Sequence, residues 1–317
     1  FTTSTLQQEA GRKLGMSVAQ TMSVAQHLYE QGLITYMRTD SVNLSVQAIA
    51  QCKKEITNLF GEKYSSAHNY KTKTKGAQEA HEAIRPTVIN LTPEQAKSSL
   101  TAEQYKLYKL IWDRFVASQM SNAVFDAVSA DIENSGYTFR ATGSKIKFDG
   151  YLAVYDNKSD EDKNLLLPPM EVGEELKLVN LKSEQHFTQP PPRYTEASLI
   201  RAMEEKGVGR PSTYAPTISV VLDREYVVKE GKALRPTNLG EAVTDLMIDK
   251  FQDIVDVQFT SNMEGQLDLV ESGEVDYRKI LDGFYHNFSA ELAQAEIDLD
   301  KKRIKVPDEE SAEVCEL

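Results

Sequence analysis

Cysteine and long hydrophobic runs are scarce in this 317-residue sequence. The two cysteines, Cys52 and Cys315, cannot form a disulfide framework, so a reducing compartment is the expected environment. No apolar run approaches the roughly 20 residues that cross a bilayer, and no signal-peptide pattern begins at Phe1. These absences predict a cytoplasmic protein without membrane association.

Positive charge is also in short supply. The 36 Lys and Arg residues are outnumbered by 48 Asp and Glu residues, which gives a net charge of −12. General adhesion to nucleic acid needs a basic surface that releases counterions, so the overall charge opposes it. A nucleic-acid site would depend on local basic clusters or on charge from other parts of the protein. The length predicts two or three domains.

Residues 32–41 (GLITYMRTDS) place a tyrosine and an arginine two positions apart in a short apolar segment that predicts a strand. Residues i and i+2 of a strand share a face, so Tyr36 and Arg38 should lie side by side while Met37 points to a core. A phenol with a pKa of about 10 is a weak nucleophile at neutral pH, and a guanidinium favours the phenolate and holds anions. The pair suits attack on a phosphodiester, although most tyrosines are packing residues.

Helix signals surround this segment. We expect a helix capped by Ser4 or Thr5, a second from Ser17 to Gly32, a third from Ser45 to Gly61, and a fourth over 101–120 with a Thr101–Gln104 capping box. The helix–turn–helix–strand order is typical of winged-helix folds and puts Tyr36 where a wing begins. The residues predicted to face inward are Val18, Met22, Ala25, Leu28 and Tyr29 on the second helix, Val46, Ile49, Cys52, Ile56 and Leu59 on the third, and Tyr105, Tyr108, Ile111, Trp112 and Phe115 on the fourth.

Alternating patterns after Val124 predict an antiparallel β region. The expected strands are 128–132, 137–140, 145–148 and 176–179, with a hairpin turn at 134–136 and loops at 62–78 and 158–163. Prolines 190–192 end this region. Beyond them we expect helices over 195–205 and 211–223, a hairpin around Gly231, and helices at 239–251 and 274–297. This second helix–turn–helix–hairpin favours nucleic-acid contact, although winged helices also bind proteins, and a winged-helix regulator is an alternative.

Two further strings contain residues suited to phosphate chemistry. In residues 80–87 (AHEAIRPT), His81 lacks the second histidine of a zinc-protease motif, and local sequence alone favours a surface histidine. Residues 207–214 (GVGRPSTY) would present free amides, the Ser212 and Thr213 hydroxyls and Arg210 at a helix start, which suits a phosphate. Ordinary helix capping by Ser212 or Thr213 is the alternative.

These three strings, with residues 191–200 (PPRYTEASLI), resemble the motifs of bacterial type IA DNA topoisomerases, the topoisomerase I family, in the family's order over residues 1–290. The resemblance implies that Tyr36 cuts one DNA strand and holds its 5′ end as a phosphotyrosine, relaxing negatively supercoiled DNA without ATP. Arg38 would stabilise and bind the phosphate, and His81 would assist proton or phosphate handling. A topoisomerase III-like relative is an alternative that the wording of the motifs favours less.

The resemblance also implies DNA contacts away from the tyrosine. Arg210 and Thr213, with Ser212 beside them, would contact the DNA backbone near the scissile phosphate, and Arg224 and Gln26 are weaker candidates for DNA contact. Tyr29 also lies on the helix that would line the DNA path, but its apolar pattern favours the core.

The expected architecture is a multidomain α+β fold. It comprises a tyrosine-bearing, winged-helix-like catalytic domain (1–121), a partial antiparallel β domain (122–190), a mostly helical DNA-gripping domain with a second winged-helix-like module (191–300), and a charged tail (301–317). We expect a monomer that binds single-stranded and negatively supercoiled DNA near the bacterial nucleoid.

In the topoisomerase I family, a Toprim domain with an acidic metal-binding cluster precedes the segment that begins at Phe1, and this sequence has no Asp-x-Asp-x-Glu string. We therefore expect Mg²⁺ to be bound by that domain and not by this chain. The chain by itself would bind single-stranded DNA without relaxing supercoils. Cys315 falls where many relatives begin a zinc region.

Overall fold

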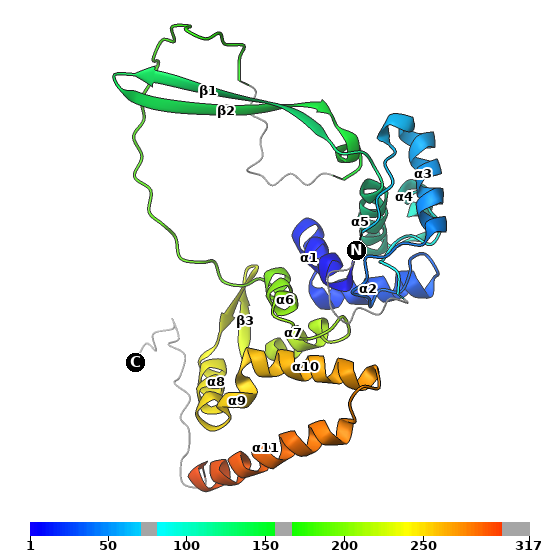
Figure 1. The fold of residues 1–317 in the computed structure, drawn as a ribbon, viewed down its shortest axis with the longest axis vertical. Helices are drawn as coiled ribbons and strands as arrows, with labels where there is room; N and C mark the ends of the chain where they lie inside the picture. Colours follow the sequence, from blue (N-terminus) through cyan, green and yellow to red (C-terminus); the bar gives the residue numbers. More distant parts are fainter. Residues whose placement is uncertain (71–80, 156–166, 300–317) are drawn as a thin grey trace, which may run out of the picture.

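The computed structural model describes residues 1–70, 81–155 and 167–299. The fold is mixed α/β, with helices and two small antiparallel sheets among the described residues (Figure 1). Residues 71–78 of the predicted loop at 62–78, the acidic loop at 158–163 and the charged tail with Cys315 lie outside the described residues.

The first part of the chain is a helical body. Its helices are α1 (Thr3–Leu14), α2 (Val18–Glu30), α3 (Val46–Phe60), α4 (Pro93–Ala96) and α5 (Ala102–Ser118), with short 3₁₀ turns η1 (Glu62–Tyr64) and η2 (Lys97–Ser99). The predicted caps Ser17, Ser45 and Thr101 are confirmed, because each side chain accepts a backbone N–H of the first helical turn. The first cap is wrong by two residues: Thr2 caps α1 through a capping box with Thr5.

The core of this body forms where α1, α2 and α5 meet. Leu6, Leu28, Leu107 and Ile111 are fully buried there. Helix α3 contributes Ala48, Cys52 and Ile56, so the prediction that Cys52 is a core residue is confirmed. The inward placement of Val46 and Leu59 is wrong: Val46 is 85% exposed and Leu59 is 48% exposed, because only the 48–52–56 face of the helix meets the core.

The β region is a single long hairpin. Strand β1 (Val124–Asn134) pairs with β2 (Tyr137–Phe148) through the predicted turn, where Ser135 and Gly136 have positive φ, and η3 (Gly150–Ala153) follows. The predicted strand at 176–179 is wrong. Residues 167–194 form no strand and run as an exposed strap from the hairpin region down to α6 (Figure 1), because no described strand lies alongside to pair with them.

The last part of the chain comprises α6 (Glu196–Glu205), α7 (Tyr214–Asp223), β3 (Val227–Glu230), β4 (Ala233–Pro236) and α8 to α11. The predicted hairpin around Gly231 is confirmed. The helix expected from Pro211 begins three residues later, at Tyr214, after a turn. Helices α8 (Asn238–Lys250) and α11 (Tyr277–Leu299) match expected elements, whereas α9 (Gln252–Val255) and α10 (Val257–Glu271) were not predicted.

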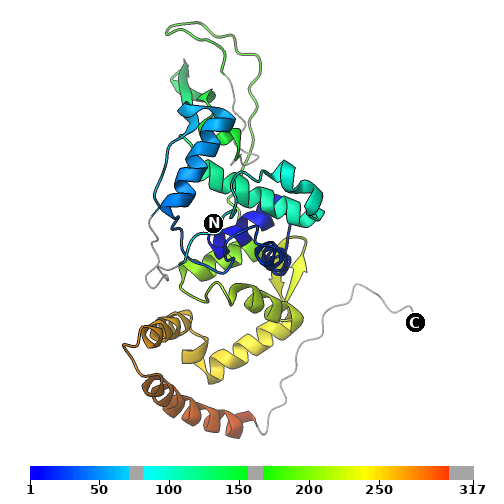
Figure 2. The same cartoon turned by 90° about the vertical axis from the view of Figure 1, so that its right-hand side faces the viewer.

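Helix α6 joins the two helical parts of the molecule. The Ser4 hydroxyl donates to Glu204 at 2.7 Å, and the Val18 N–H donates to Glu196 at 2.8 Å. Glu196 also pairs with Lys229 of β3. In the side view of Figure 2, α6 and α7 accordingly lie between the first body and the layer of α8 to α11.

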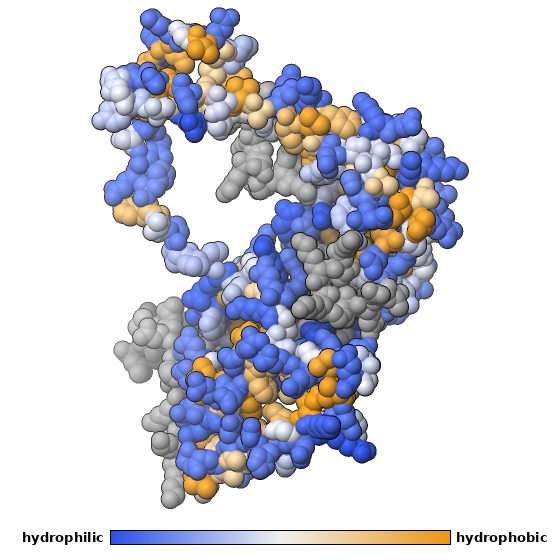
Figure 3. All heavy atoms as spheres, viewed as in Figure 1, coloured by the Kyte–Doolittle hydropathy of each residue, from blue (hydrophilic) through white to orange (hydrophobic). Residues whose placement is uncertain are grey.

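The surface is mostly polar. In Figure 3 hydrophilic side chains cover most of the visible face, and the opening between the strap and the body persists when all heavy atoms are drawn. Among the described helices, none combines the length and the apolar character that a membrane crossing requires.

Gly240 provides a test of how α8 packs on the second hairpin. A Cβ at this position would lie 2.1 Å from the Tyr226 carbonyl oxygen, whereas a Cβ at Gly265 on α10 would meet no atom within 4 Å. We predict that Gly240→Ala destabilises the fold by about 1–3 kcal/mol through this clash. Gly265→Ala should instead stabilise it by up to about 1 kcal/mol through helix propensity. Thermal melting followed by circular dichroism measures both, and a Gly240→Ala protein that melts like wild type would contradict the packing.

Candidate active site

The segment that carries Tyr36 is held by the segment that carries His81. The Thr35 N–H donates to the Arg85 carbonyl at 2.9 Å, and the Thr87 N–H donates to the Leu33 carbonyl at 3.0 Å. The predicted strand is nevertheless wrong. Only an isolated bridge joins Ile34 to Pro86, and the nearby Ile84 N–H donates to the Phe1 carbonyl at 2.8 Å instead of to the tyrosine segment.

The start of α1 fixes the other end of the tyrosine segment. Thr3 is fully buried. Its hydroxyl donates to the Met37 carbonyl at 2.7 Å and accepts from the Thr39 N–H at 2.8 Å. The Thr3 N–H donates to the Thr39 carbonyl at 2.8 Å. Tyr36 therefore lies between two anchored stretches of backbone.

Side chains alternate along this segment despite the absence of a strand. Met37 is 2% exposed and points to the core as predicted, while Tyr36 is 41% exposed. Arg38 is exposed as well and has no hydrogen-bond or ion-pair partner among the residues that the structure describes. An accessible phenol and an uncompensated guanidinium therefore lie two residues apart.

The Tyr36 ring lies between two other rings. Its centroid is 5.2 Å from that of Tyr29 and 6.2 Å from that of His81, both in edge-on arrangements. The structure thus brings Tyr36 and His81 together, which sequence spacing alone could not establish. The core placement of Tyr29 is wrong, because its side chain is 40% exposed on the last turn of α2.

Glu82 fixes the segment that carries His81. Its carboxylate accepts from the Ser45 N–H at 2.7 Å and from the Arg85 guanidinium at 2.5 Å. Partial burial opposes ionisation, but these hydrogen bonds and the charge of Arg85 together lower the pKa of Glu82. The neighbour of His81 is thus a structural anchor that ties 81–87 to the start of α3, a role not predicted from sequence.

The second predicted site, residues 207–214, differs from expectation in its donors. The N–H groups of Gly207 and Val208 already donate to carbonyls of α6, and Thr213 and Tyr214 donate to the Arg210 carbonyl. The prediction of free amides is therefore wrong for these four groups. Side-chain capping by Thr213 is also contradicted, because its hydroxyl accepts from the Arg210 N–H at 2.8 Å instead.

Arg210 is the cation of this loop. Its guanidinium donates to Asp268 of α10 at 2.7 Å and to the Gly209 carbonyl at 2.9 Å, and it lies 3.8 Å from Glu264. Burial opposes its charge, but the hydrogen bond and charge of Asp268 outweigh this and raise the pKa of Arg210. Asp268 and Glu264 were missed because no helix was predicted there. Asp256, which caps α10, was the available signal.

Charges from both predicted sites act on the pKa of Tyr214. Burial raises the pKa of Tyr214 to about 12, with further increases from the charges of Glu204 and Asp40 and an opposing effect of Arg210. Asp40 belongs to the tyrosine segment, so charges from the Arg210 loop and from that segment both act on one buried tyrosine. Helices α2 and α7 also pack together.

The remaining predicted DNA contacts are Ser212, Arg224 and Gln26. Ser212 is exposed in the turn before α7, and Arg224 is exposed where α7 ends. Gln26 is half-buried on α2 and donates to Glu30 at 2.7 Å. No hydrogen bond or ion pair between described residues joins these three side chains to Tyr36 or His81.

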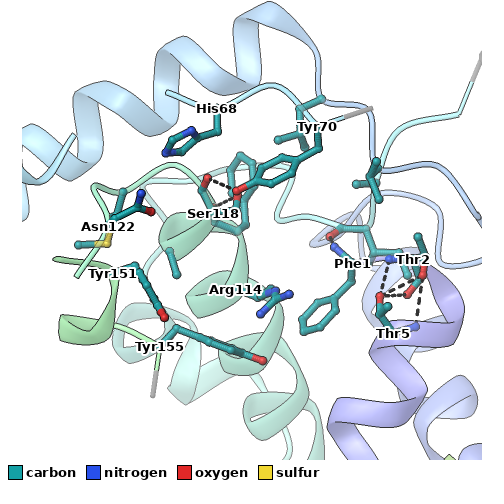
Figure 4. A pocket seen from close by; sticks show the side chains of 17 residues that line it. Phe1, Thr2, Thr5, His68, Tyr70, Arg114, Ser118, Asn122, Tyr151 and Tyr155 are labelled. Atoms are coloured by element: carbon teal, nitrogen blue, oxygen red, sulfur yellow. Dashed lines mark hydrogen bonds between the residues drawn. The ribbon is translucent and has the colours of Figure 1, made fainter. Parts of the chain in front are cut away.

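A cavity of about 330 Å³ lies on the other side of the segment that carries His81, where Ala83 and Ile84 line it. Figure 4 shows Arg114 between the rings of Phe1 and Tyr155, with its guanidinium 5.6 Å and 5.0 Å from their centroids. The Tyr70 hydroxyl donates to the Ser118 carbonyl at 2.9 Å at its rim. This cavity contains neither Tyr36 nor Arg38.

No group of three or more His, Cys, Asp or Glu side chains within 1–70, 81–155 and 167–299 is arranged to hold a metal ion.

Comparison with known proteins identifies the fold. The sequence model of the DNA topoisomerase family matches residues 1–282. The structure is similar to that of full-length topoisomerase I from Thermotoga maritima, with a TM-score of 0.82 and 44% identity over 92% of this chain. The match covers 49% of the Thermotoga chain, so this chain spans about half the length of that relative.

Thr3 allows a test of the anchor behind Tyr36. We predict that Thr3→Val destabilises the fold by about 1–3 kcal/mol, because the Met37 carbonyl and Thr39 N–H lose a buried partner. Thr3→Ser, which keeps the hydroxyl, should lose much less of the free energy of unfolding. Urea unfolding measures both variants, and equal losses would show that the hydroxyl is not the anchor.

Glu82 gives a pH-dependent prediction. Its folded-state pKa is lowered, so the stability that it contributes is present above the unfolded value of about 4.3 and is lost as the pH falls through the folded value. Glu82→Gln should therefore be less stable than wild type at pH 7, and the difference should shrink below about pH 4. Urea midpoints at several pH values measure this, and a difference that stays constant with pH would contradict the role of the carboxylate.

Proposed function

This chain belongs to the DNA topoisomerase family, and we propose that it is the part of a type IA topoisomerase that carries the strand-cutting tyrosine. The observation that carries this proposal is the exposed Tyr36 phenol, packed against His81 and two residues from Arg38, whose guanidinium has no partner among the described residues. A phosphate of single-stranded DNA would meet a nucleophile, a base and a cation at one place.

In the proposed reaction the Tyr36 oxygen attacks a backbone phosphorus and gives up its proton. The bond from phosphorus to the 3′ oxygen breaks, and that oxygen leaves as a hydroxyl after taking a proton. His81 is the ring against Tyr36 that can accept the phenol proton or hold the phosphate. Arg38 stabilises the negative charge that gathers on the non-bridging oxygens.

Resealing is the reverse of this step. The 3′ hydroxyl attacks the phosphotyrosine and expels the phenolate, which is a competent leaving group, so the energy of the phosphodiester is retained and no ATP is needed. Between cutting and resealing, the other strand passes through the gap. This sequence would relax negatively supercoiled DNA.

Magnesium would assist by offsetting charge on the phosphates. Among the described residues, no group of three or more His, Cys, Asp or Glu side chains is arranged to hold a metal ion, and we propose that Mg²⁺ is held by a Toprim domain outside them. No step above depends on it.

DNA is the proposed partner of both predicted sites. The net charge of −12 restricts attraction to local cations, and Arg38, Arg210 and Arg224 are the arginines that we propose face the backbone, with Ser212, Thr213 and Gln26 alongside. The helix–turn–helix–hairpin at 196–236 supports a winged-helix-like DNA-gripping module in the last domain.

A second function is single-stranded DNA binding without cleavage. It is favoured for the chain by itself, because the chain spans about half the length of a full topoisomerase I. We propose that the isolated chain binds single-stranded DNA weakly and does not relax supercoils.

The nucleophile can be tested by trapping the covalent intermediate. The chain, alone and with a Toprim domain from the family, is mixed with Mg²⁺ and a single-stranded oligonucleotide labelled at its 3′ end, since the attached fragment is the one with the new 5′ phosphate. We predict a denaturant-resistant adduct with the Toprim domain, abolished by Tyr36→Phe because the nucleophilic oxygen is removed.

The control is Tyr137→Phe, which removes an exposed hydroxyl from the hairpin and should leave the adduct unchanged. An absence of adduct from wild-type protein under both conditions, or an adduct that persists in Tyr36→Phe, would overturn the proposal.

A further inference from the structure

One face of α10 packs against the loop that carries Arg210. Ser261, Glu264 and Asp268 are three and four residues apart, so they lie in one stripe along the helix. A Cβ at Gly207 would lie 2.6 Å from the Ser261 hydroxyl oxygen. Glu264 and Asp268 both lie against the Arg210 guanidinium. The stripe therefore contacts the loop at two places, the turn at Gly207 and the guanidinium of Arg210.

Hydrogen bonds fix both the backbone N–H and the guanidinium of Arg210. Its own N–H donates to the Thr213 hydroxyl, and its guanidinium donates through Nη2 to Asp268 and through Nη1 to the Gly209 carbonyl. A guanidinium has five N–H donors, and these two bonds leave three for a ligand. About a third of the side chain (32%) is exposed to receive one.

The geometry points to a role for this arrangement that rests on the DNA-binding function proposed above. We propose that Asp268, supported by Glu264, is a positioning residue. It fixes the plane of the Arg210 guanidinium so that the remaining N–H groups can donate to a phosphate of DNA. Asp268 does not itself contact the nucleic acid. It acts through Arg210.

Two effects of Asp268 on phosphate binding oppose each other. Its charge repels a phosphate, but at a partly exposed site salt screens this repulsion over a Debye length of about 8–10 Å. Its hydrogen bond removes in advance the conformational freedom that a long side chain would otherwise lose on binding. Paired N–H donors bind phosphate only when the guanidinium plane is correctly oriented, so we expect the positioning effect to be the larger.

Fluorescence anisotropy of the whole chain with a labelled single-stranded oligonucleotide, at several salt concentrations, tests this proposal. We expect Arg210→Ala to weaken binding about tenfold and to reduce the salt slope by about 1. Asp268→Asn should weaken binding about threefold or more. The double variant should bind no more weakly than Arg210→Ala, because Asp268 acts only through the arginine.

The control is Asp131→Asn, which removes the carboxylate from an Arg–Asp pair of equal length (2.7 Å) on the hairpin and should leave DNA binding unchanged. Circular dichroism checks that each variant is folded. Arg210→Lys keeps the charge but loses the paired N–H donors of the guanidinium, so it should weaken binding almost as much as Arg210→Ala. If Asp268→Asn does not fold, Arg210→Lys is the variant that tests whether the orientation of the guanidinium matters.

Three outcomes would overturn the inference: Asp268→Asn that binds like wild type, Asp268→Asn that binds more tightly because the carboxylate competes with phosphate, or Arg210→Lys that binds like wild type. If wild-type protein does not bind the oligonucleotide, the proposed DNA-binding function itself fails. The two failures are therefore distinguishable.

Discussion

The pairing of residues 33–35 with residues 85–87 is the constraint on which the candidate site depends. Two backbone hydrogen bonds, which together form one isolated bridge, hold these segments together, although about fifty residues separate them in sequence. The pairing puts His81 against Tyr36. The buried Thr3 hydroxyl completes the frame by holding Met37 and Thr39, so a ring 41% exposed to solvent stands on backbone fixed from both sides.

Helix α6 extends this frame to the second site. Its Glu204 and Glu196 accept hydrogen bonds from α1 and from the start of α2, and the loop that follows carries Arg210. Tyr214 is buried, and its pKa is shifted by Arg210 of the loop and by Asp40 of the tyrosine segment. The cation proposed to hold DNA is therefore fixed relative to the body that carries the proposed nucleophile, and α10 sets its orientation.

Much of this architecture was predictable from local sequence. Caps such as Ser17 and Thr101, and the hairpin turn at 134–136, follow from side-chain chemistry within a few residues, and the three motif strings pointed to the family that the comparisons identify. The errors arose where tertiary packing decides. Val46 and Tyr29 fit an apolar helical face but lie beyond the core, and residues 176–179 alternate like a strand without a partner to pair with.

Sequence also could not give the relations between distant residues. The contact between Tyr36 and His81 depends on a backbone bridge, and the partner of Arg210 comes from a helix that has no strong apolar periodicity to reveal it. The role of Tyr36 is best tested at the atom that would form the covalent bond.

The most direct test is to locate the nucleotide in the protein–DNA adduct by mass spectrometry. Trypsin cleavage after Lys13 and Arg38 releases a peptide that holds both Tyr29 and Tyr36, and fragmentation of that peptide distinguishes them. The account predicts a nucleotide joined through its 5′ phosphate to the Tyr36 oxygen. A nucleotide on Tyr29, or on a residue outside this peptide, would contradict it.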